Sequence, residues 1–342
     1  MPQLEFDIID RFFRSADLNF PGEGVDLAIG DDCALVTIEA GHQMALSMDL
    51  LQEGVHFPGS APPELLGQRA LAVNLSDLAA AGADPVCFTL GLSLPEIDTD
   101  WLKAFCGGLA SLAGRYNCPL VGGDLIRGFL QIAIQVQGRV PTGQALLRSG
   151  ARSGDLIYVT GTLGDAAAAL SMLNDGVKES ALFTNGKLSG KQRDFFLQAF
   201  YAPEPRIAVG KALRGLATAA IDISDGLLSD LGHVVTASGV GAELDLVQLP
   251  YSAALRENVQ DEGQRQELAL GGGDDYELCL TVSPDNCRSV EKVVADLGVP
   301  LTRIGEIVSG AGIECLDSYG EPVAIGRAGF SHFRGESSCR QA

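Results

Sequence analysis

Apolar and polar side chains alternate strictly in one segment of the first half of the chain. In residues 130–136, with the sequence LQIAIQV, every second side chain is a large aliphatic one, and Gln, Ala and Gln lie between them. This period of two predicts a strand with one buried face. Residues 44–51, MALSMDLL, predict a second strand with an acid near its end, and residues 64–81 predict a helix that stops at Gly82. We expect an antiparallel sheet covered on one face.

The second half of the chain alternates strand-like and helix-like segments. The runs LIYVTG, AIDIS, AELDLV and DYELCLTV are typical of strands. Between the halves, residues 138–154 are rich in Gly, Pro, Ser and Arg, which is typical of a domain junction. We therefore predict an α/β (α+β) protein with two domains, residues 1–145 and 146–342. The polar run 175–193 is expected to be a surface excursion, and helices are expected near residues 164–174, 203–217, 227–238 and 284–297.

Length and charge narrow the function. A chain of 342 residues with 46% hydrophobic residues is long enough for two separate cores. It carries 24 Lys and Arg against 44 Asp and Glu, a formal net charge of -20. This charge repels nucleic acids and anionic membrane surfaces, so we expect neither as a partner. A nucleotide would be repelled as well, unless bound divalent cations reverse the local potential.

Cysteine usage and the first residues predict a cytoplasmic protein. The eight cysteines are scattered without a CxxC pair, which gives no sign of a zinc site or a redox dithiol. The opening MPQLEFDIIDRFF lacks the order of a signal peptide. No uninterrupted apolar run approaches the roughly 18 residues that a membrane span requires. We expect reduced, mostly buried thiols.

Acidic residues recur at the ends of apolar runs. The chain contains neither GxxxxGK[ST] nor a GxGxxG after a strand, so a P-loop is not expected to hold a nucleotide. A carboxylate beside apolar residues is costly to desolvate unless it is paired or bound to a metal, and hard oxygen ligands suit Mg²⁺. Glycines next to several of these acids would let the backbone approach a phosphate closely. The candidate acids are Asp31, Asp32, Asp49, Asp77, Asp124, Asp222 and Asp225.

Each of these acids also has a structural interpretation when it is taken alone. Asp31, Asp32 and Asp124 follow glycines and suit turns. Asp222 and Asp225 flank a serine at a strand-to-helix turn, where an N-cap is the ordinary role. Only the joint occurrence of the acids points to a metal site.

Two basic residues are candidates for the same site. Arg148, in LLRSGA, would suit bidentate binding of a phosphate, and it would equally suit a solvated arginine between domains. His56 lies beside an aromatic residue in GVHF, where a lone histidine is more often packed or hydrogen-bonded than a catalytic base. Neither residue identifies a reaction alone.

The order of the motifs along the chain resembles a known family. AIGDDCALV is followed by a strand that ends in Asp, and then by GVHF, AVNLSDLAAAGADP, GGD, LLRSGA, VTGTLGDAAA, IDISDGLLSDL and GGDDYEL. In series these motifs closely resemble those of the thiamine-monophosphate kinases. That family shares a superfamily with aminoimidazole ribonucleotide synthetase, selenophosphate synthetase and a hydrogenase maturation protein. The resemblance extends from about residue 6 to residue 333.

The resemblance implies a fold, a reaction and partners. The fold would be that of aminoimidazole ribonucleotide synthetase, with N-terminal domains that join their sheets in a homodimer. ATP and several Mg²⁺ ions would lie between the two domains of each subunit, with thiamine monophosphate as the phosphoryl acceptor. Phosphoryl transfer asks mainly for positioning and charge neutralisation, so no covalent catalytic residue is expected, and catalysis would rest on the metal ligands and Arg148.

Matching the family by position implies three groups of site residues. The implied metal ligands are Asp32, Ser47, Met48, Asp49, Asp77, Asp124, Asp222 and Asp225. The implied nucleotide contacts are Gly123, Asp124, Arg148, Ser224 and Tyr116. The implied acceptor contacts are His56, Asp274 and Phe330. Three of these positions depart from the family pattern, since Met48 replaces a threonine, Asp274 a glutamate, and Phe330 a larger or hydroxylated aromatic residue.

Two other functions stay open at this point. The chain could be another ATP-dependent enzyme of the superfamily, acting on a formamidine-containing ribonucleotide or on selenide. A selenide enzyme would carry a reactive cysteine near its N-terminus, whereas the first cysteine here is Cys33, inside an acidic motif. The chain could also be a non-catalytic sensor of a magnesium nucleotide.

Overall fold

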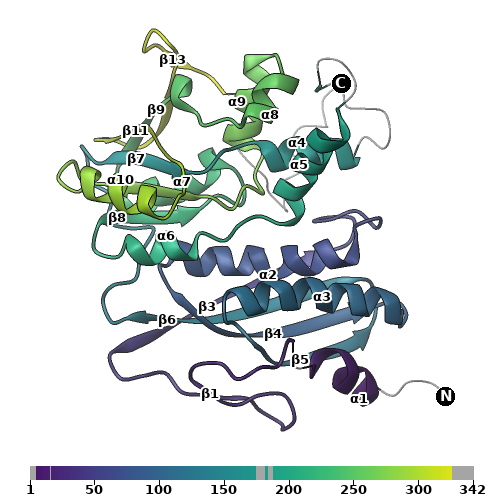
Figure 1. The fold of residues 1–342 in the computed structure, drawn as a ribbon. Helices are drawn as coiled ribbons and strands as arrows, with labels where there is room; N and C mark the ends of the chain where they lie inside the picture. The colour runs from purple at the N-terminus through teal and green to yellow at the C-terminus, as the bar shows by residue number, and fades with distance from the viewer. Residues whose placement is uncertain (1–4, 16, 175–181, 184–187, 326–342) are drawn as a thin grey trace, which may run out of the picture.

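The computed structural model describes residues 5–15, 17–174, 182–183 and 188–325, and the structural statements below concern these residues. Two sheets lie one above the other, each formed by one half of the chain, and helices lie between them (Figure 1). Helix α2 (Pro63–Ala80) lies nearest the middle, between the N-terminal sheet and the C-terminal half. It is therefore in a position to contact both halves.

The first half of the chain forms a four-stranded sheet with the order β3-β6-β4-β5. The pairs β3–β6 and β6–β4 are antiparallel, and β4–β5 is parallel. A small sheet of β1 and β2 precedes it. The other elements of this half are α1 (Glu5–Ile8), a π-helical segment η1 (Ile9–Phe13), β1 (Val25–Leu27), β2 (Leu35–Val36), β3 (His42–Gln52), β4 (Asp84–Leu94), α3 (Thr99–Arg115), β5 (Leu120–Arg127) and β6 (Gln131–Pro141).

The second half forms a seven-stranded sheet with the order β13-β12-β9-β11-β7-β10-β8. Only the pair β9–β12 is parallel among these strands. Its strands are β7 (Leu156–Thr160), β8 (Ala217–Asp222), β9 (Gly241–Asp245), β10 (Leu278–Val282), β11 (Leu301–Val308), β12 (Gly312–Leu316) and β13 (Pro322–Val323). Its helices are α4 (Asp165–Asn174), α5 (Gly190–Tyr201), α6 (Ile207–Ala212), α7 (Leu227–Ser238), the 3-10 segment η2 (Leu246–Gln248), α8 (Ala253–Asn258), α9 (Glu262–Gly271) and α10 (Cys287–Asp296).

The N-terminal sheet has one covered and one uncovered face. In β6 every second side chain is buried, as the period of two predicts. In β3 four successive side chains that point away from the helices are apolar, and each is 45% to 59% exposed. This row, which we name the β3 apolar row, consists of Met44, Leu46, Met48 and Leu50.

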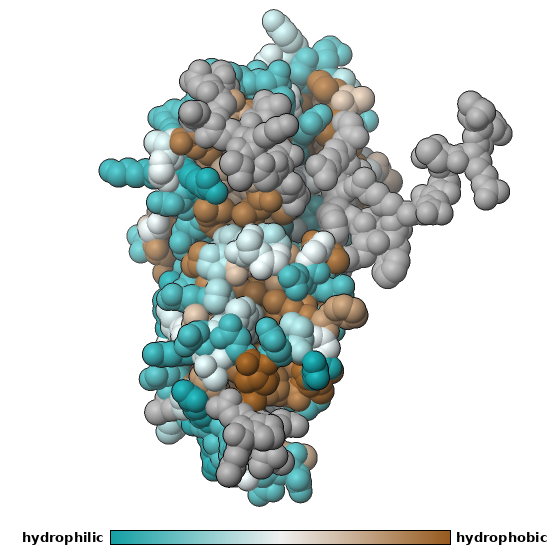
Figure 2. Space-filling view, turned by 90° about the vertical axis from the view of Figure 1, so that its right-hand side faces the viewer, coloured by the Kyte–Doolittle hydropathy of each residue, from teal (hydrophilic) through white to brown (hydrophobic). Residues whose placement is uncertain are grey.

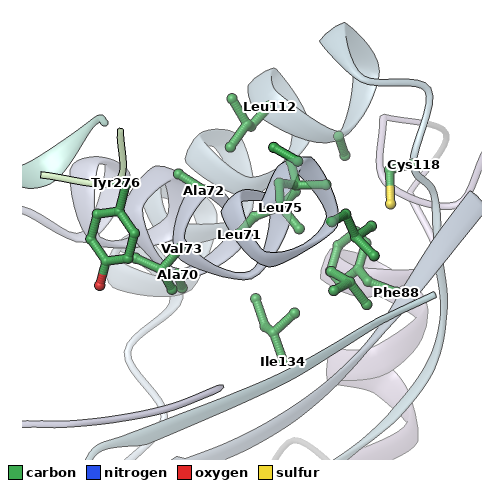
Figure 3. Packing of buried hydrophobic residues seen from close by; sticks show 14 of the residues in the cluster. Ala70, Leu71, Ala72, Val73, Leu75, Phe88, Leu112, Cys118, Ile134 and Tyr276 are labelled. Carbon is green, nitrogen blue, oxygen red and sulfur yellow. The ribbon is translucent and has the colours of Figure 1, made fainter. Parts of the chain in front are cut away.

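Helix α2 is apolar on most sides because it is buried from both halves. It begins with a proline at its first helical position, where the missing N–H costs no hydrogen bond, and it ends before Gly82, whose φ is +65°. Leu71 and Leu75 pack in one cluster with Phe88 of β4 (Figure 3). The same cluster includes Tyr158 of β7 and Leu278 and Leu280 of β10, so the two halves share one buried core.

The surface shown in Figure 2 carries separate apolar patches between hydrophilic side chains. Among the described helices, none combines the length and the hydropathy that a membrane-spanning helix needs. The predicted division between residues 145 and 146 falls between the last strand of one sheet and the first strand of the other. It stays a prediction.

Most of the expected elements are present, with two differences in extent. The strand expected at residues 44–51 is part of β3, and the helices expected near 64–81 and 227–238 are α2 and α7. The helix expected over 203–217 is wrong in length, because α6 ends at Ala212 and residue 217 already pairs with β10. The expected junction also begins too early, since β6 continues to Pro141 and pairs there with β3.

Candidate active site

Helix α2 fixes two residues of β3 at the candidate site. Ser47 Oγ donates a hydrogen bond to Asp77 Oδ2 over 2.5 Å, and the backbone N–H of Asp49 donates to Asn74 Oδ1 over 3.0 Å. Asn74 and Asp77 are three residues apart on a helix, and Ser47 and Asp49 are two apart on a strand, so each pair shares a face. The two periods bring together residues that are about 30 positions apart in the chain.

Helix α2 also reaches the last residue of β8 in the other half. Ser76 Oγ donates to Asp222 Oδ2 over 2.7 Å, and both side chains are buried. Burial, followed by the charge of Asp77, raises the pKa of Asp222 to about 8. Burial, followed by the charges of Asp77 and Asp225, raises the pKa of Asp49 to about 6. These four carboxylates, Asp49, Asp77, Asp222 and Asp225, are close enough to repel one another, and we name them the central acids.

The central acids fit metal ions that are shared with a substrate. Within the described ranges, no three Asp, Glu, His or Cys side chains converge closely enough to hold one ion by themselves. Mg²⁺ usually takes one or two carboxylates and completes its shell with water and substrate phosphates, so such a trio is not required. The raised pKa values of Asp49 and Asp222 reflect buried negative charge without enough positive charge nearby, which a divalent cation would supply.

Arg148 lies at the edge of this acidic site. Burial raises the pKa of Asp77, and the hydrogen bond from Ser47 and the positive charge of Arg148 oppose that rise. The Arg148 side chain is exposed, and its backbone carbonyl accepts a hydrogen bond from Ser238 Oγ over 3.3 Å. An exposed guanidinium next to carboxylates suits a phosphate group held between them.

A buried carboxylate shapes the turn that carries Ser224 and Asp225. Asp230 Oδ2 accepts backbone N–H groups of Ser224, Asp225 and Gly226 over 3.0, 3.0 and 3.1 Å. Burial and the charge of Asp225 raise the pKa of Asp230 to about 7, while the three N–H donors oppose the rise. Asp230 was not among the candidate residues predicted from the sequence. In the sequence, Asp230 could have been recognised as an acid four residues after a glycine, in the first turn of a predicted helix.

The loop before β10 lies directly against this turn. The backbone N–H of Asp274 donates to the carbonyl oxygen of Ser224, and that of Tyr276 donates to the carbonyl oxygen of Ile223, both over 2.8 Å. Asp274 and Tyr276 have φ values of +63° and +51°, in a backbone region that residues other than glycine rarely adopt. Such backbone strain persists where the surroundings impose it and is frequent at functional sites. The implied acceptor residue Asp274 is thereby held beside the central acids.

Another group of implied ligands lies elsewhere. A cavity of about 650 Å³ between the N-terminal segment and strands β4 and β5 is lined by Asp31, Asp32, Gly123 and Asp124. Asp49 is aligned with Gly123 across the four strands of the sheet. Three strand spacings of about 4.8 Å separate them by about 14 Å. One subunit therefore divides the implied metal ligands into the central acids and a second group in this cavity.

Tyr116, an implied nucleotide contact, lies with neither group. Its hydroxyl is within hydrogen-bond distance of Glu204 Oε1, at 2.6 Å, and of the Pro205 carbonyl oxygen, at 3.0 Å. Burial and the adjacent Glu204 carboxylate raise the pKa of this phenol above its usual range. The tyrosine ties the end of α3 to the segment before α6, and a nucleotide contact there stays a prediction.

The other implied residues are placed as follows. His56 Nδ1 accepts the backbone N–H of Gln52 over 3.0 Å just after β3. Met48 belongs to the β3 apolar row and points away from α2, so only its backbone is directed toward the central acids. Phe330 lies outside the described residues.

Three further residues of α2 contact the site and were not among the implied site residues. Asn74 and Ser76 make the bonds to β3 and β8 given above, and Arg69 donates to Asp274 Oδ1 over 2.5 Å. In the sequence, these residues stand out as polar side chains inside an otherwise apolar helix. Two of them lie in the segment AVNLSDLAA. Polar side chains on a buried helix need partners, and here the partners belong to the site.

Comparison with known proteins identifies the class. Residues 30–140 match the N-terminal domain of AIR synthase related proteins, and residues 152–317 match their C-terminal domain. These matches span most of the chain. Together with the two stacked α/β halves and the acids between them, they define a protein of the AIR synthase related class, and the predicted fold class is confirmed.

The relatives narrow this class further. Thiamine-monophosphate kinase of Escherichia coli (strain K12) is 46% identical over 332 residues, which cover 96% of this chain and 98% of that protein. The crystal structure of thiamine-monophosphate kinase from Stenotrophomonas maltophilia K279a is 42% identical, with a TM-score of 0.83 over 94% of this chain and 99% of that one. The structure of AaThiL complexed with AMPPCP and TMP is 28% identical, with a TM-score of 0.73 over 97% and 99%. The chain belongs to the thiamine-monophosphate kinase family.

Proposed function

We propose that this protein transfers the γ-phosphoryl group of ATP to thiamine monophosphate, which yields ADP and thiamine diphosphate. The observation that carries the proposal is the direct bonding around α2. Ser47 and Asp222, one from each half of the chain, both bond to α2, and the Asp274 loop bonds to the turn that follows Asp222. Donor and acceptor sites on the two sides of this arrangement would be adjacent, as direct transfer requires.

The charge of each residue indicates its role in this reaction. The central acids would hold Mg²⁺, which supplies charge neutralisation and a clamp on the phosphates when bound. Arg148 lies at the exposed edge of the central acids and would bind a phosphate group bidentately. Ser224 would contact the same nucleotide. An acceptor phosphate is already anionic at neutral pH, so no general base is needed to activate it.

The acceptor would lie on the side of Asp274. Its carboxylate is partly exposed and is held next to Ser224 by the backbone bond described above. A carboxylate there suits a cationic or amino-bearing heterocycle. His56, at the end of β3, and Phe330 are proposed as further acceptor contacts, and Gly123 and Tyr116 as nucleotide contacts.

We further propose a homodimer that covers the β3 apolar row. Four apolar side chains, each about half exposed, form a continuous row on a strand at the edge of its sheet. Natural proteins seldom leave such an edge bare, because it invites pairing with other chains. A second copy with the same row satisfies both surfaces in a symmetric dimer.

Compartment and partners follow from charge and cysteine chemistry. The seven cysteines in the described residues are all free thiols, six of them buried, which suits a reducing compartment. With a net charge of -20, binding to nucleic acid or to anionic membranes is disfavoured. We therefore propose a cytoplasmic protein whose partners are its two small substrates and a second copy of itself.

The test is ATP turnover with and without thiamine monophosphate, with the product identified by mass spectrometry and Mg²⁺ varied. Formation of ADP and thiamine diphosphate in equal amounts, abolished by a chelator, is expected. Turnover only with a formamidine-containing ribonucleotide or with selenide would assign the chain to another reaction of its superfamily. ATP binding without turnover of any of these acceptors would make it a sensor.

A further inference from the structure

Arg69 is a fully buried arginine in the middle of α2. Its exposed fraction is 1%, and it is the largest side chain among those that are almost completely buried. Nη1 donates to the backbone carbonyl of Phe200, at the end of α5, and Nη2 donates to Asp274 Oδ1, each over 2.5 Å. The guanidinium also lies over the Phe200 ring, 4.0 Å from its centroid. One side chain of the N-terminal half thus binds two separate segments of the C-terminal half.

Burying a guanidinium costs desolvation free energy, and the apolar core beside Arg69 gains no hydrogen bond from it. A buried charge is tolerated only with partners, and one donor of Arg69, Nε, has no hydrogen-bond partner among the described residues. The neighbours of Arg69 on α2, Ala70, Leu71 and Val73, are apolar and buried, and Tyr276 lies beside Ala70 and Val73 (Figure 3). An apolar side chain at this position would be buried at a lower desolvation cost. We therefore attribute the arginine to the bond that it makes with Asp274.

That partner, Asp274, is engaged on only one of its two oxygens. Oδ1 accepts from Arg69 and lies 3.4 Å from the hydroxyl of Tyr276. In the described part of the chain, Oδ2 has no hydrogen-bond partner, and the Asp274 side chain is 23% exposed. The arginine therefore holds the carboxylate in one orientation, with its second oxygen available to a ligand.

We propose that Arg69 is a positioning residue for the acceptor, which fixes Asp274 so that Oδ2 faces the substrate heterocycle. The inference rests on the proposed function, because it assigns Asp274 to the acceptor. Arg69 and Asp77 are eight residues apart on one helix, about 12 Å at 1.5 Å per residue. The same rigid helix therefore sets the place of a central acid and the place of the acceptor carboxylate.

The test compares Arg69→Met, Arg69→Lys and Asp274→Asn in the full-length enzyme. Arg69→Met is expected to raise the KM for thiamine monophosphate about tenfold or more, since a charge-assisted bond is lost, while the KM for ATP stays within about twofold. The kcat at saturating acceptor should change far less than that KM. Arg69→Lys should recover part of the loss, because it keeps the charge but not the two-point fork.

The double variant separates positioning from mere stability. If Arg69 acts through Asp274, then adding Arg69→Met to Asp274→Asn should raise the acceptor KM little further. The affinities of the wild type and the variants for thiamine monophosphate, measured by calorimetry without ATP, should fall in the same order as their acceptor KM values rise. Should Arg69→Met not fold, Arg69→Lys alone and combined with Asp274→Asn make the same comparison.

The chain offers a matched control in Arg214. This partly buried arginine also bonds one backbone carbonyl and one carboxylate of the other half, those of Gly82, at 2.5 Å, and of Asp84, at 2.8 Å. Neither partner belongs to the proposed site. Arg214→Met should lower the melting temperature without a selective effect on the acceptor KM.

The outcomes distinguish the inference from the function on which it rests. A wild-type enzyme that neither binds nor phosphorylates thiamine monophosphate overturns the proposed function itself. An active wild type whose Arg69 variants lose melting temperature like Arg214→Met, with both KM values moving together or not at all, overturns the positioning role alone. Additive effects of Arg69→Met and Asp274→Asn on the acceptor KM would overturn it as well.

Discussion

Asp49 and Asp124 lie on the two edge strands of the N-terminal sheet and point to opposite faces of it. Asp49 is aligned across the strands with Gly123, and Asp124 is the next residue, paired with Gly91. Neighbouring side chains on a strand point to opposite faces, and the edges are about 14 Å apart. Ligands of one Mg²⁺ lie about 2.1 Å from it, so one subunit does not bring both carboxylates to one ion. A shared ion would need the Asp124 of a second subunit.

This relationship predicts complementation between inactive variants. Asp49→Asn and Asp124→Asn should each be inactive alone, but subunits co-expressed in equal amounts should recover about a quarter of the wild-type activity. Half of the dimers would be mixed, and one of the two sites in each would carry both native carboxylates. The measurement is turnover of the purified mixture against each variant alone.

The matched control for complementation is a mixture of Asp49→Asn with Asp77→Asn. Both residues belong to the central acids of one subunit, so mixing should restore nothing. Recovery in this control, or none in the mixture with Asp124→Asn, would show that the site is not shared between subunits in the way proposed.

If the β3 apolar row is covered in the proposed dimer, one charge introduced there should dissociate that dimer. Leu46 is 58% exposed, and an aspartate there would place an unpaired charge within the covered surface. Leu46→Asp is expected to run as a monomer by light scattering and to lose activity, with its subunits still folded by circular dichroism. Val247, 56% exposed in the other half, offers a control, because Val247→Asp should leave the mass unchanged.

Asp77 is expected to be indispensable for catalysis and nearly neutral for folding. Removing its charge from the proposed metal site should lower kcat by about 10³-fold, roughly 4 kcal/mol of transition-state stabilisation. Asp77→Asn keeps the size of the side chain and the acceptor for Ser47. Turnover is measured at several Mg²⁺ concentrations, with the exposed Asp100→Asn as control. Near-normal turnover of Asp77→Asn at saturating Mg²⁺ would remove Asp77 from the metal site.

Asp275 predicts a dependence of stability on pH that is separate from the central acids. Its carboxylate accepts the backbone N–H of Gly164 over 3.0 Å. Desolvation in this partly buried position, followed by the charges of Asp165 and Glu277, raises its pKa well above 3.8. The folded state therefore keeps a proton that the unfolded state loses above pH 3.8. Stability falls as the pH rises from that value toward the raised pKa of the native state.

The isosteric variant Asp275→Asn removes this titration and keeps an acceptor for Gly164. As the pH rises above about 4, the melting temperature of the wild type should fall relative to that of the variant, both measured in chelator. Asp285→Asn, an exposed acid, should follow the wild type at every pH. A constant difference between wild type and Asp275→Asn would mean that Asp275 stays ionised in the fold.

Local patterns predicted the elements, because strands and helices have periods of two and of 3.6 residues, and the candidate acids, because these recur at the ends of apolar runs. The alternation in residues 130–136 was enough for β6, and the prolines and glycine around α2 were enough for its ends. The same motifs also singled out Asp49, Asp77 and Asp222 as members of one site. The elements follow from residues close to the position concerned, whereas the grouping of these acids into one site rested on their joint occurrence along the chain.

Contacts between distant segments were beyond such patterns. Arg69 and Asp274 are 205 positions apart, and nothing in the neighbourhood of either residue indicates the other. The separation of Asp124 from Asp49 depends on strand order, which the spacing of motifs does not contain. Asp230 was missed because its role, to bind three consecutive backbone N–H groups, arises only once the turn has formed.

The position of α2 has a consequence for how the protein unfolds. This helix packs on one sheet, bonds through Ser76 to the other, and contributes to a core that contains side chains of both halves. If α2 came away, each sheet would expose part of that core at once. We therefore expect a single calorimetric transition, with the calorimetric and van't Hoff enthalpies equal, in place of the two steps typical of loosely joined domains.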